Sequence, residues 1–238
     1  VFENQAAAPV FADVAPEKWT QWTWQMQNAL SSAEECRDVF GLSQDELRGF
    51  QISENVFKIS TTPYYASLIA RVPALRRIMV PDGREGQAGA QQMLDPLAEV
   101  HHGISRNLIH RYSDRVLFLV TDVCSVYCRF CTRKRFTGKE QGAVGSKEDL
   151  GALQYIRSHP GIREVILSGG DPLTLSNGVL QRVLADLRAI EHIEIIRLGS
   201  RMPVVCPMRI DDELISILKK HGPIYLMTHF NHPKELTA

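Results

Sequence analysis

The second half of the chain alternates short apolar runs with amphipathic stretches. The runs have the length of strands and cover residues 116–120, 164–167, 193–198 and 224–228. In the stretches between them, apolar residues recur every three or four positions, as on one face of a helix. These residues are Leu150, Leu153 and Ile156; Leu180, Val183, Leu184, Leu187 and Ile190; and Leu214, Ile217 and Leu218. Buried strands that alternate with helices predict βα units and a parallel sheet or barrel. About four units are expected, fewer than a closed barrel needs, so the pattern predicts a partial (βα) barrel in the α/β class.

The first half has a different pattern, which predicts short helices over residues 18–72. One helical face carries Trp19, Trp22, Met26, Ala29 and Leu30. Serines that precede glutamates by three residues predict capping boxes at 31–35 and 43–46, and the Thr-Pro pair at 62–63 predicts another helix start. Residues 73–105 are rich in Pro and Gly and are expected to form an irregular linker. We therefore divide the chain into an arm, helical region and linker (1–105) and the partial barrel (106–238).

Composition excludes several classes of protein. The 238 residues carry 27 basic and 27 acidic side chains, and 44% of them are hydrophobic. This balance is typical of a globular protein and disfavours disorder or a broad nucleic-acid surface. No apolar run reaches the length of a membrane span, and the first residues lack the pattern of a signal peptide. We expect a cytoplasmic protein that binds neither nucleic acid nor membrane.

Three of the five cysteines are clustered. Cys124, Cys128 and Cys131 follow the first expected strand in a C-x3-C-x2-C pattern, whereas Cys36 and Cys206 stand apart and are expected to be small buried side chains. An odd, clustered set does not suit a disulfide framework. Three thiolates in one loop at a strand end suit an iron–sulfur cluster, because structural zinc prefers four ligands. One iron of a four-iron cluster would then be open to a substrate.

This pattern, with an aromatic residue before the third cysteine, resembles the radical S-adenosylmethionine superfamily. The resemblance implies a [4Fe-4S] cluster whose open iron binds S-adenosylmethionine. Residues Ser168, Gly169, Gly170 and Asp171 close the second expected strand and resemble the glycine-rich segment that holds the methionine amino group in this superfamily. Read alone, Gly-Gly-Asp-Pro is a common turn, and its position after a strand favours the functional interpretation.

Basic residues flank the first expected strand on both sides. Arg133 lies in a basic run after the cysteines, and its guanidinium could bind a substrate carboxylate; the alternative is a solvated basic face. Arg111 and Arg115 precede the strand and could bind a phosphate; the alternative is surface ion pairing with Asp114.

Longer stretches resemble the lysine 2,3-aminomutase family. They are TTPYYASLI, DPLAE, HRYSDRVLFLVTDVCSVYCRFCTRKRF, EVILSGGDPL, GSRMPVVCPMRI and MTHFNHP, within about residues 61–234. The resemblance implies pyridoxal 5′-phosphate as a second cofactor, with its phosphate held by Arg111, Tyr112, Arg115, Arg209 and Arg201. It also implies that Arg133 contacts the amino-acid carboxylate. Two further residues would lie near S-adenosylmethionine: Phe130 at the adenine, where lysine-specific relatives often have His, and His229 or His232 at the methionine portion. For both histidines, an ordinary strand-end position is the alternative.

The resemblance implies an isomerase that moves the α-amino group of an amino acid, L-lysine first, to C3 by a 5′-deoxyadenosyl radical and pyridoxal phosphate mechanism. It would need a small-molecule amino acid and a reductant such as flavodoxin or ferredoxin, and the open barrel edge predicts a homo-oligomer. Family members are longer, and their pyridoxal-binding lysine lies in the C-terminal part. We therefore interpret the chain as truncated and do not assign Lys234 to that role.

Two other functions stay open at this point. One is a related radical enzyme that acts on a lysine within a protein or on another amine. The other is an inactive iron–sulfur-binding fragment. Pyridoxal absorbance would separate the two enzymes from the inactive fragment. Turnover of free lysine or of lysine within a protein would separate the two enzymes from each other.

Overall fold

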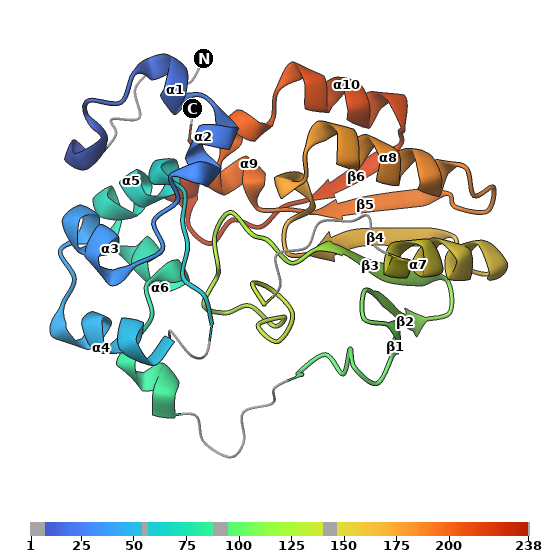
Figure 1. Cartoon of the computed structure of the whole chain (residues 1–238), viewed down its shortest axis with the longest axis horizontal. Helices are drawn as coiled ribbons and strands as arrows, with labels where there is room; N and C mark the ends of the chain where they lie inside the picture. Colours follow the sequence, from blue (N-terminus) through green and yellow to red (C-terminus); the bar gives the residue numbers. More distant parts are fainter. Residues whose placement is uncertain (1–7, 54–56, 88–94, 140–146, 238) are drawn as a thin grey trace.

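The computed structural model describes residues 8–53, 57–87, 95–139 and 147–237, and their centre is a six-stranded sheet with the order β1-β2-β3-β4-β5-β6 (Figure 1). The strands are β1 (Gly103–Ser105), β2 (Leu108–Tyr112), β3 (Arg115–Thr121), β4 (Glu164–Gly169), β5 (Ile195–Gly199) and β6 (Ile224–Met227). Strands β3 to β6 are parallel, and each lies within two residues of the bounds expected from the sequence. The prediction of an α/β fold with four parallel strands is confirmed, and the sheet is open.

The sequence did not predict β1 and β2. They pair antiparallel with each other and with β3, so the sheet is mixed. Only Leu108 and Ile109 of β2 are buried, while Arg111 and Tyr112 are exposed. This half-exposed strand lacks the continuous apolar run that marks a central strand. β1 begins before residue 106, and the division at 105/106 stays a prediction.

Three helices cover one face of the sheet (Figure 1). They are α7 (Lys147–Ser158), α8 (Asn177–Arg188) and α10 (Asp212–Lys220). The expected apolar face of α8 is buried, and the side chains of Ser176 and Asp211 cap α8 and α10. The expected face of α7 was partly wrong, because Leu150 is 69% exposed while Ala152 and Ile156 are buried.

The N-terminal region consists of short helices, as expected: α1 (Pro16–Trp19), α2 (Trp22–Gln27), α3 (Ala33–Phe40), α4 (Gln44–Ser53), α5 (Pro63–Arg71) and α6 (Arg76–Met79). The single helix expected over Trp19–Leu30 was wrong, because Thr20 and Gln21 separate α1 from α2, and Leu30 forms an isolated bridge with Thr61. The capping boxes at Ser32–Glu35 and Ser43–Glu46 are confirmed, and Thr62 caps α5.

The expected linker is partly regular. It contains short 3₁₀ turns at Pro73–Leu75 and Gly83–Gln87 around α6, and then β1. Other short elements are η1 (Pro9–Phe11), η4 (Pro172–Thr174), α9 (Met202–Val205), η5 (Pro207–Arg209) and η6 (Pro233–Glu235).

The N-terminal helices gather beyond the carboxyl ends of the parallel strands (Figure 1). Two main-chain hydrogen bonds fasten the loop after β3 to this region, from Tyr127 N to Ser60 O (3.1 Å) and from Arg129 N to Ile78 O (2.7 Å). Buried residues of both halves form one hydrophobic core. The strand ends where α/β proteins place their chemistry are therefore covered by a packed layer.

The sheet edge at β6 differs from the interior of the sheet. Tyr225, Leu226 and Met227 are exposed, whereas β4 and β5 bury most of their apolar side chains. Across the described parts of the chain, no helix has the length and apolar character that crossing a membrane requires.

Candidate active site

The three clustered cysteines lie in the loop that follows β3. Cys124, Cys128 and Cys131 are all free thiols and partly exposed, whereas Cys36 and Cys206 are buried in the core, as expected. The chain reaches this loop directly from a buried strand, and Arg129 N of the loop donates to Ile78 O of α6. One short segment therefore presents three sulfur ligands at the carboxyl end of the sheet.

Two nitrogen donors face these sulfurs. Arg201 Nη1 lies 2.9 Å from Cys128 Sγ, and the main-chain N–H of Arg133 donates to Cys131 Sγ at 3.3 Å. Burial raises the pKa of Cys128, and the positive charge of Arg201 opposes that rise. Burial also raises the pKa of Cys124 well above its ordinary value, and the nearby charges of Asp171, Cys131 and Cys128 add to the effect. The donors favour the thiolate forms that an iron–sulfur cluster needs.

The sulfur donors of the loop suit an iron–sulfur cluster. Within the residues that the structure describes, no group of three or more His, Cys, Asp or Glu side chains is arranged to hold one metal ion. In a four-iron cluster each thiolate binds a different iron, so the three sulfurs need not meet at one centre. Three free thiols supply cysteine ligands of the kind that such a cluster binds, and the N–H donors on two of them can tune its potential.

The Gly169–Gly170 pair brings the loop after β4 against the cysteine loop. Gly169 has a φ of 114°, and a Cβ there would lie 2.4 Å from Thr121 O. A Cβ on Gly170 would lie 2.2 Å from Val123 O. Main-chain hydrogen bonds join the loops, from Gly170 N to Thr121 O and from Asp171 N to Val123 O. The glycines are therefore needed for contact between two loops, which the sequence had suggested only for contact with a ligand.

Asp171 organises the neighbouring strand end. Its carboxylate is buried and accepts hydrogen bonds from the main-chain nitrogens of Leu173, Arg201 and Met202 at 3.0, 2.8 and 3.2 Å. Burial raises its pKa, and the hydrogen bonds from Ser200 and these nitrogens oppose the rise. Asp171 thus joins the loops after β4 and β5 beside the cysteines.

Aromatic side chains lie on the same side of the sheet. Phe130 is 49% exposed, and its ring centre lies 5.6 Å from that of His229. Ser168 is partly buried, and its hydroxyl lies beside Gly199. His232 instead accepts from Lys234 N and caps η6. Of the two histidines considered, His229 therefore lies next to Phe130. An accessible ring beside three cysteines fits the flat adenine of S-adenosylmethionine.

A second group of candidates lines a cavity beside the first half of β3, which also reaches Arg133 of the cysteine loop. This arginine-lined cavity has a volume of about 290 Å³, and its walls include Arg111, Tyr112, Arg115 and Arg133. The guanidinium carbons of Arg111 and Arg115 each lie 5.6 Å from the centre of the Tyr112 ring. The predicted phosphate-binding residues are thus neighbours, and three guanidinium groups around one cavity fit a phosphate dianion and a carboxylate.

Arg115 also forms the ion pair with Asp114 that was considered as the alternative to phosphate binding. Arg115 Nε lies 3.1 Å from Asp114 Oδ1, and the hydrogen bond from Arg115 holds the pKa of the Asp114 carboxyl below its ordinary value. Both side chains are partly exposed to solvent, so the pair adds little to stability. Arg115 therefore forms a surface ion pair and lines the cavity at the same time.

Two predicted phosphate contacts lie outside the cavity walls. Arg201 donates to Glu235 Oε1 at 2.8 Å as well as to Cys128, which places it at the cysteine end. Arg209 is fully buried, donates to Leu173 O and Leu175 O, and packs over the Trp22 ring at 4.5 Å. In this arrangement its guanidinium supports the loop after β4, and its role at a phosphate stays a prediction.

Sequence reasoning missed three residues that organise these groups. Glu99 binds Arg133, and Tyr65 OH donates to Glu235, which in turn binds Arg201. Tyr65 and Glu99 belong to the stretches TTPYYASLI and DPLAE, which were noted without a role for either residue. No spacing in the sequence indicated that these side chains would meet arginines far along the chain.

Comparison with known proteins identifies the family to which this chain is similar. The family model described as the radical SAM superfamily matches residues 118–237. The chain is 45% identical over 231 residues to an L-lysine 2,3-aminomutase from Fusobacterium nucleatum, covering 95% of this chain and 54% of that protein. The corresponding protein of Clostridium subterminale is 42% identical over 231 residues, with 96% and 56% coverage.

A protein named glutamate 2,3-aminomutase, from Clostridioides difficile, is also similar. It is 34% identical over 224 residues, covering 93% of this chain and 53% of that protein. The chain thus spans about half the length of the curated relatives it matches. The cysteine loop, the glycine pair and the strand ends that carry them all fall inside the matched range, and the chain belongs to the radical S-adenosylmethionine superfamily.

Proposed function

We propose that the whole protein is an amino-acid 2,3-aminomutase that converts L-lysine to β-lysine. The observation that carries the proposal is the pair of sites on β3, with three free cysteines after its carboxyl end and an arginine-lined cavity at its amino end. A radical source and a holder for an anionic amino-acid adduct can then act in one protein. The similarity to proteins named L-lysine 2,3-aminomutase supports the choice of reaction.

At the cysteine end, Cys124, Cys128 and Cys131 would hold a [4Fe-4S] cluster. Phe130 and His229 would lie along S-adenosylmethionine, with Ser168 and the Gly169–Gly170 segment beside its methionine part. When bound, the cluster and S-adenosylmethionine together supply a carbon-centred radical, and pyridoxal phosphate supplies a ring that stabilises an unpaired electron on the substrate.

At the cavity, the residues of this chain bind and orient. Arg111, Tyr112 and Arg115 would hold the phosphate of pyridoxal phosphate, because guanidinium groups bind phosphate oxygens in pairs. Arg133 would bind the substrate carboxylate. Its main-chain nitrogen already contacts Cys131 Sγ, so one residue joins the radical source to the substrate. The N-terminal helices packed beside the cysteine loop would help to exclude water from the radical.

Further proposals concern the assembly. The exposed apolar side chains of β6 support a sheet that belongs to a larger barrel. We also propose a small-molecule amino acid as substrate, a protein reductant of the flavodoxin or ferredoxin type, and a homo-oligomer.

The test begins with anaerobic reconstitution of the whole protein with iron and sulfide. Electron paramagnetic resonance of the reduced protein should show a four-iron signal that changes when S-adenosylmethionine is added. With pyridoxal phosphate and a reductant, L-lysine should then yield β-lysine, measured by chromatography, and L-glutamate should react far more slowly. A folded protein without a cluster signal would contradict the cofactor assignment. Turnover of glutamate alone, or of lysine only within a protein, would contradict the substrate.

A further inference from the structure

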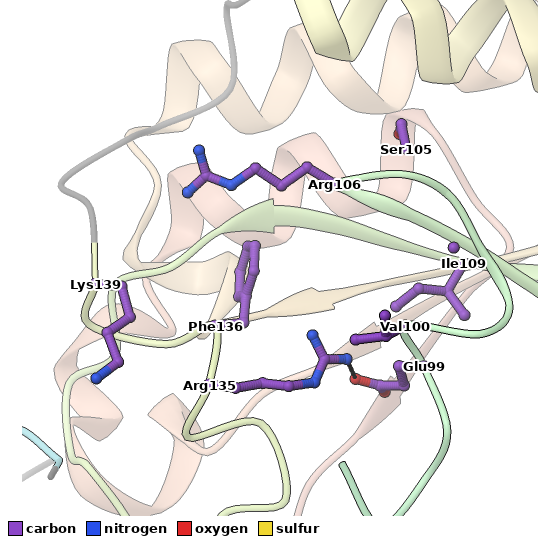
Figure 2. A pocket seen from close by; sticks show the side chains of 9 residues that line it. Glu99, Val100, Ser105, Arg106, Ile109, Arg135, Phe136 and Lys139 are labelled. Carbon is purple, nitrogen blue, oxygen red and sulfur yellow. Dashed lines mark hydrogen bonds and ion pairs between the residues drawn. The ribbon is translucent and has the colours of Figure 1, made fainter. Parts of the chain in front are cut away.

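Glu99 is a buried carboxylate shared by two arginines. Its Oε1 accepts from Arg133 Nε at 2.8 Å, and its Oε2 accepts from Arg135 Nη2 at 2.8 Å. The side chain of Glu99 is 6% exposed, so these bonds form largely away from water. Charge-assisted bonds in such a setting are strong and directional. Figure 2 shows the guanidinium of Arg135 meeting the Glu99 carboxylate at the edge of a neighbouring cavity.

A tight turn at residues 95–100 places this carboxylate. Asp95 Oδ2 accepts from Val100 N at 2.8 Å, and Ala98 has a φ of 53°, which is unusual for a residue with a side chain. The same turn also holds Arg111, whose Nη1 donates to Leu97 O at 3.0 Å. Three arginines from β2 and the cysteine loop are therefore held by one short segment that lies far from the cysteines in sequence.

Within the described parts of the chain, Glu99 binds Arg133 in a way that leaves the two terminal nitrogens of its guanidinium group free. The bond uses Nε of the guanidinium, and the described residues provide no partner for Nη1 or Nη2. Arg133 lines the arginine-lined cavity, so the two terminal nitrogens remain available to a ligand. Two parallel N–H groups match the two oxygens of a carboxylate.

We propose that Glu99 is the positioning residue that orients Arg133 for the carboxylate of the amino-acid substrate. This inference rests on the proposed function, because it assumes that Arg133 binds that carboxylate. Glu99 fixes Nε, Arg135 holds the second oxygen of Glu99 in place, and the guanidinium plane is set before the substrate arrives. Preorganisation of this kind raises affinity, because less conformational freedom of the side chain is lost on binding.

The test compares two ligands that differ only at the carboxylate, L-lysine and L-lysine amide. Binding is measured by calorimetry on the whole protein, carrying its oxidised cluster and pyridoxal phosphate but no S-adenosylmethionine, so that no turnover occurs. The wild type should bind L-lysine more tightly than the amide. Glu99→Gln can accept from only one arginine, so its affinity for L-lysine should fall about tenfold, as loss of a charge-assisted bond predicts, while its affinity for the amide changes less than twofold.

Glu46→Gln is the matched control. Glu46 binds Arg76 Nη2 at 2.8 Å in the N-terminal helical region, so the variant removes a similar ion pair without touching the cavity. Its preference for L-lysine over the amide should equal that of the wild type. If the wild type has no preference, the assignment of Arg133 fails. If the wild type prefers L-lysine and Glu99→Gln retains the full preference, or loses affinity for both ligands equally, Glu99 does not position Arg133.

Discussion

The two ends of β3 carry different chemistry and are built in different ways. At the carboxyl end, Cys124, Cys128 and Cys131 come from one loop of eight residues. At the amino end, the arginine-lined cavity draws on β2, β3, the turn at 95–100 and Arg133 from the cysteine loop. The first site needs a short segment and a strand to support it. The second also includes Ile166 of β4 and exists only after five segments have packed together.

Because the two sites are built differently, we expect substitutions to affect cofactor binding at each of them in a different way. Function in α/β proteins is expected at the carboxyl ends of strands, and residues at the amino ends more often serve stability. Here the amino end holds charged side chains around a cavity, with Arg115 and Asp114 paired at its rim. Changes at the cysteine end should therefore remove a cofactor outright, whereas changes at the cavity should weaken binding by degrees.

The largest effect is expected from Cys128→Ala. A cluster held by two thiolates should not assemble, so the iron content and the four-iron resonance signal of the reconstituted protein should be lost. The cavity lies at the other end of β3, and affinity for pyridoxal phosphate, measured by absorbance, should remain. Loss of iron with unchanged pyridoxal phosphate affinity would show that the two sites bind their cofactors independently.

Cys36→Ala is the control for this substitution. Cys36 is also a free cysteine but lies in the core near the N-terminal helices, so its loss should cost some stability and no iron. Full iron content in Cys128→Ala, or an equal loss of iron in both variants, would remove Cys128 from the ligand set.

The second effect concerns the contact that holds the cysteine loop. Gly170→Ala would place a methyl group 2.2 Å from Val123 O and 2.7 Å from two carbonyl carbons, all main-chain atoms that cannot rotate away. We expect a loss of about 3 kcal/mol in the free energy of unfolding, measured with urea, together with poor cluster assembly.

Gly178→Ala provides the comparison, because its Cβ would meet no atom within 4 Å in α8. It should be neutral or stabilise the protein by up to about 1 kcal/mol, since alanine favours helix. Equal stability of the two variants would mean that the glycine pair does not hold the loops together.

The cysteine end could be predicted from the sequence because its signals are local. The C-x3-C-x2-C spacing, the apolar run of β3 and the glycines after β4 each lie within a few residues. The parallel strands were predicted for the same reason, since buried strands and amphipathic helices have distinct periods. Helix breaks such as Thr20–Gln21 depend on packing and were missed.

The amino end could be predicted only in part. Arg111, Tyr112 and Arg115 were selected through resemblance, but the hairpin that places them was not expected, because β2 is half-exposed and polar. Glu99 and Glu235 meet their arginines across 34 residues each. Long-range ion pairs have no period in the sequence, so only the folded chain reveals them.

The next prediction tests whether Arg201 acts at the cysteine end of β3 or at the phosphate site. It was predicted at the phosphate, yet its Nη1 lies 2.9 Å from Cys128 Sγ. Arg201→Lys keeps the charge but cannot reach Cys128, Tyr65 and Glu235 together. Because hydrogen bonds to sulfur favour the reduced cluster, the reduction potential should fall by tens of millivolts in a redox titration, with unchanged affinity for pyridoxal phosphate.

Tyr65→Phe serves as the control for Arg201. It removes the hydroxyl that bonds Glu235 and accepts from Arg201 Nη2, and it leaves the Arg201–Cys128 contact. Its potential should stay close to that of the wild type. A drop in pyridoxal phosphate affinity in Arg201→Lys at constant potential would move Arg201 to the other site.

The smallest effects are expected at the arginine-lined cavity. Arg111→Ala and Arg115→Ala should each weaken pyridoxal phosphate binding about tenfold, as expected for one charge-assisted bond in a partly exposed site, while iron content stays constant. Arg163→Ala is the matched control, since Arg163 pairs with the same Asp114 as Arg115 but does not line the cavity. If all three variants lose affinity equally, net charge and not the geometry of the cavity governs binding. A loss confined to Arg111 and Arg115 would instead establish that the residues lining the cavity at the amino end of β3 hold the cofactor.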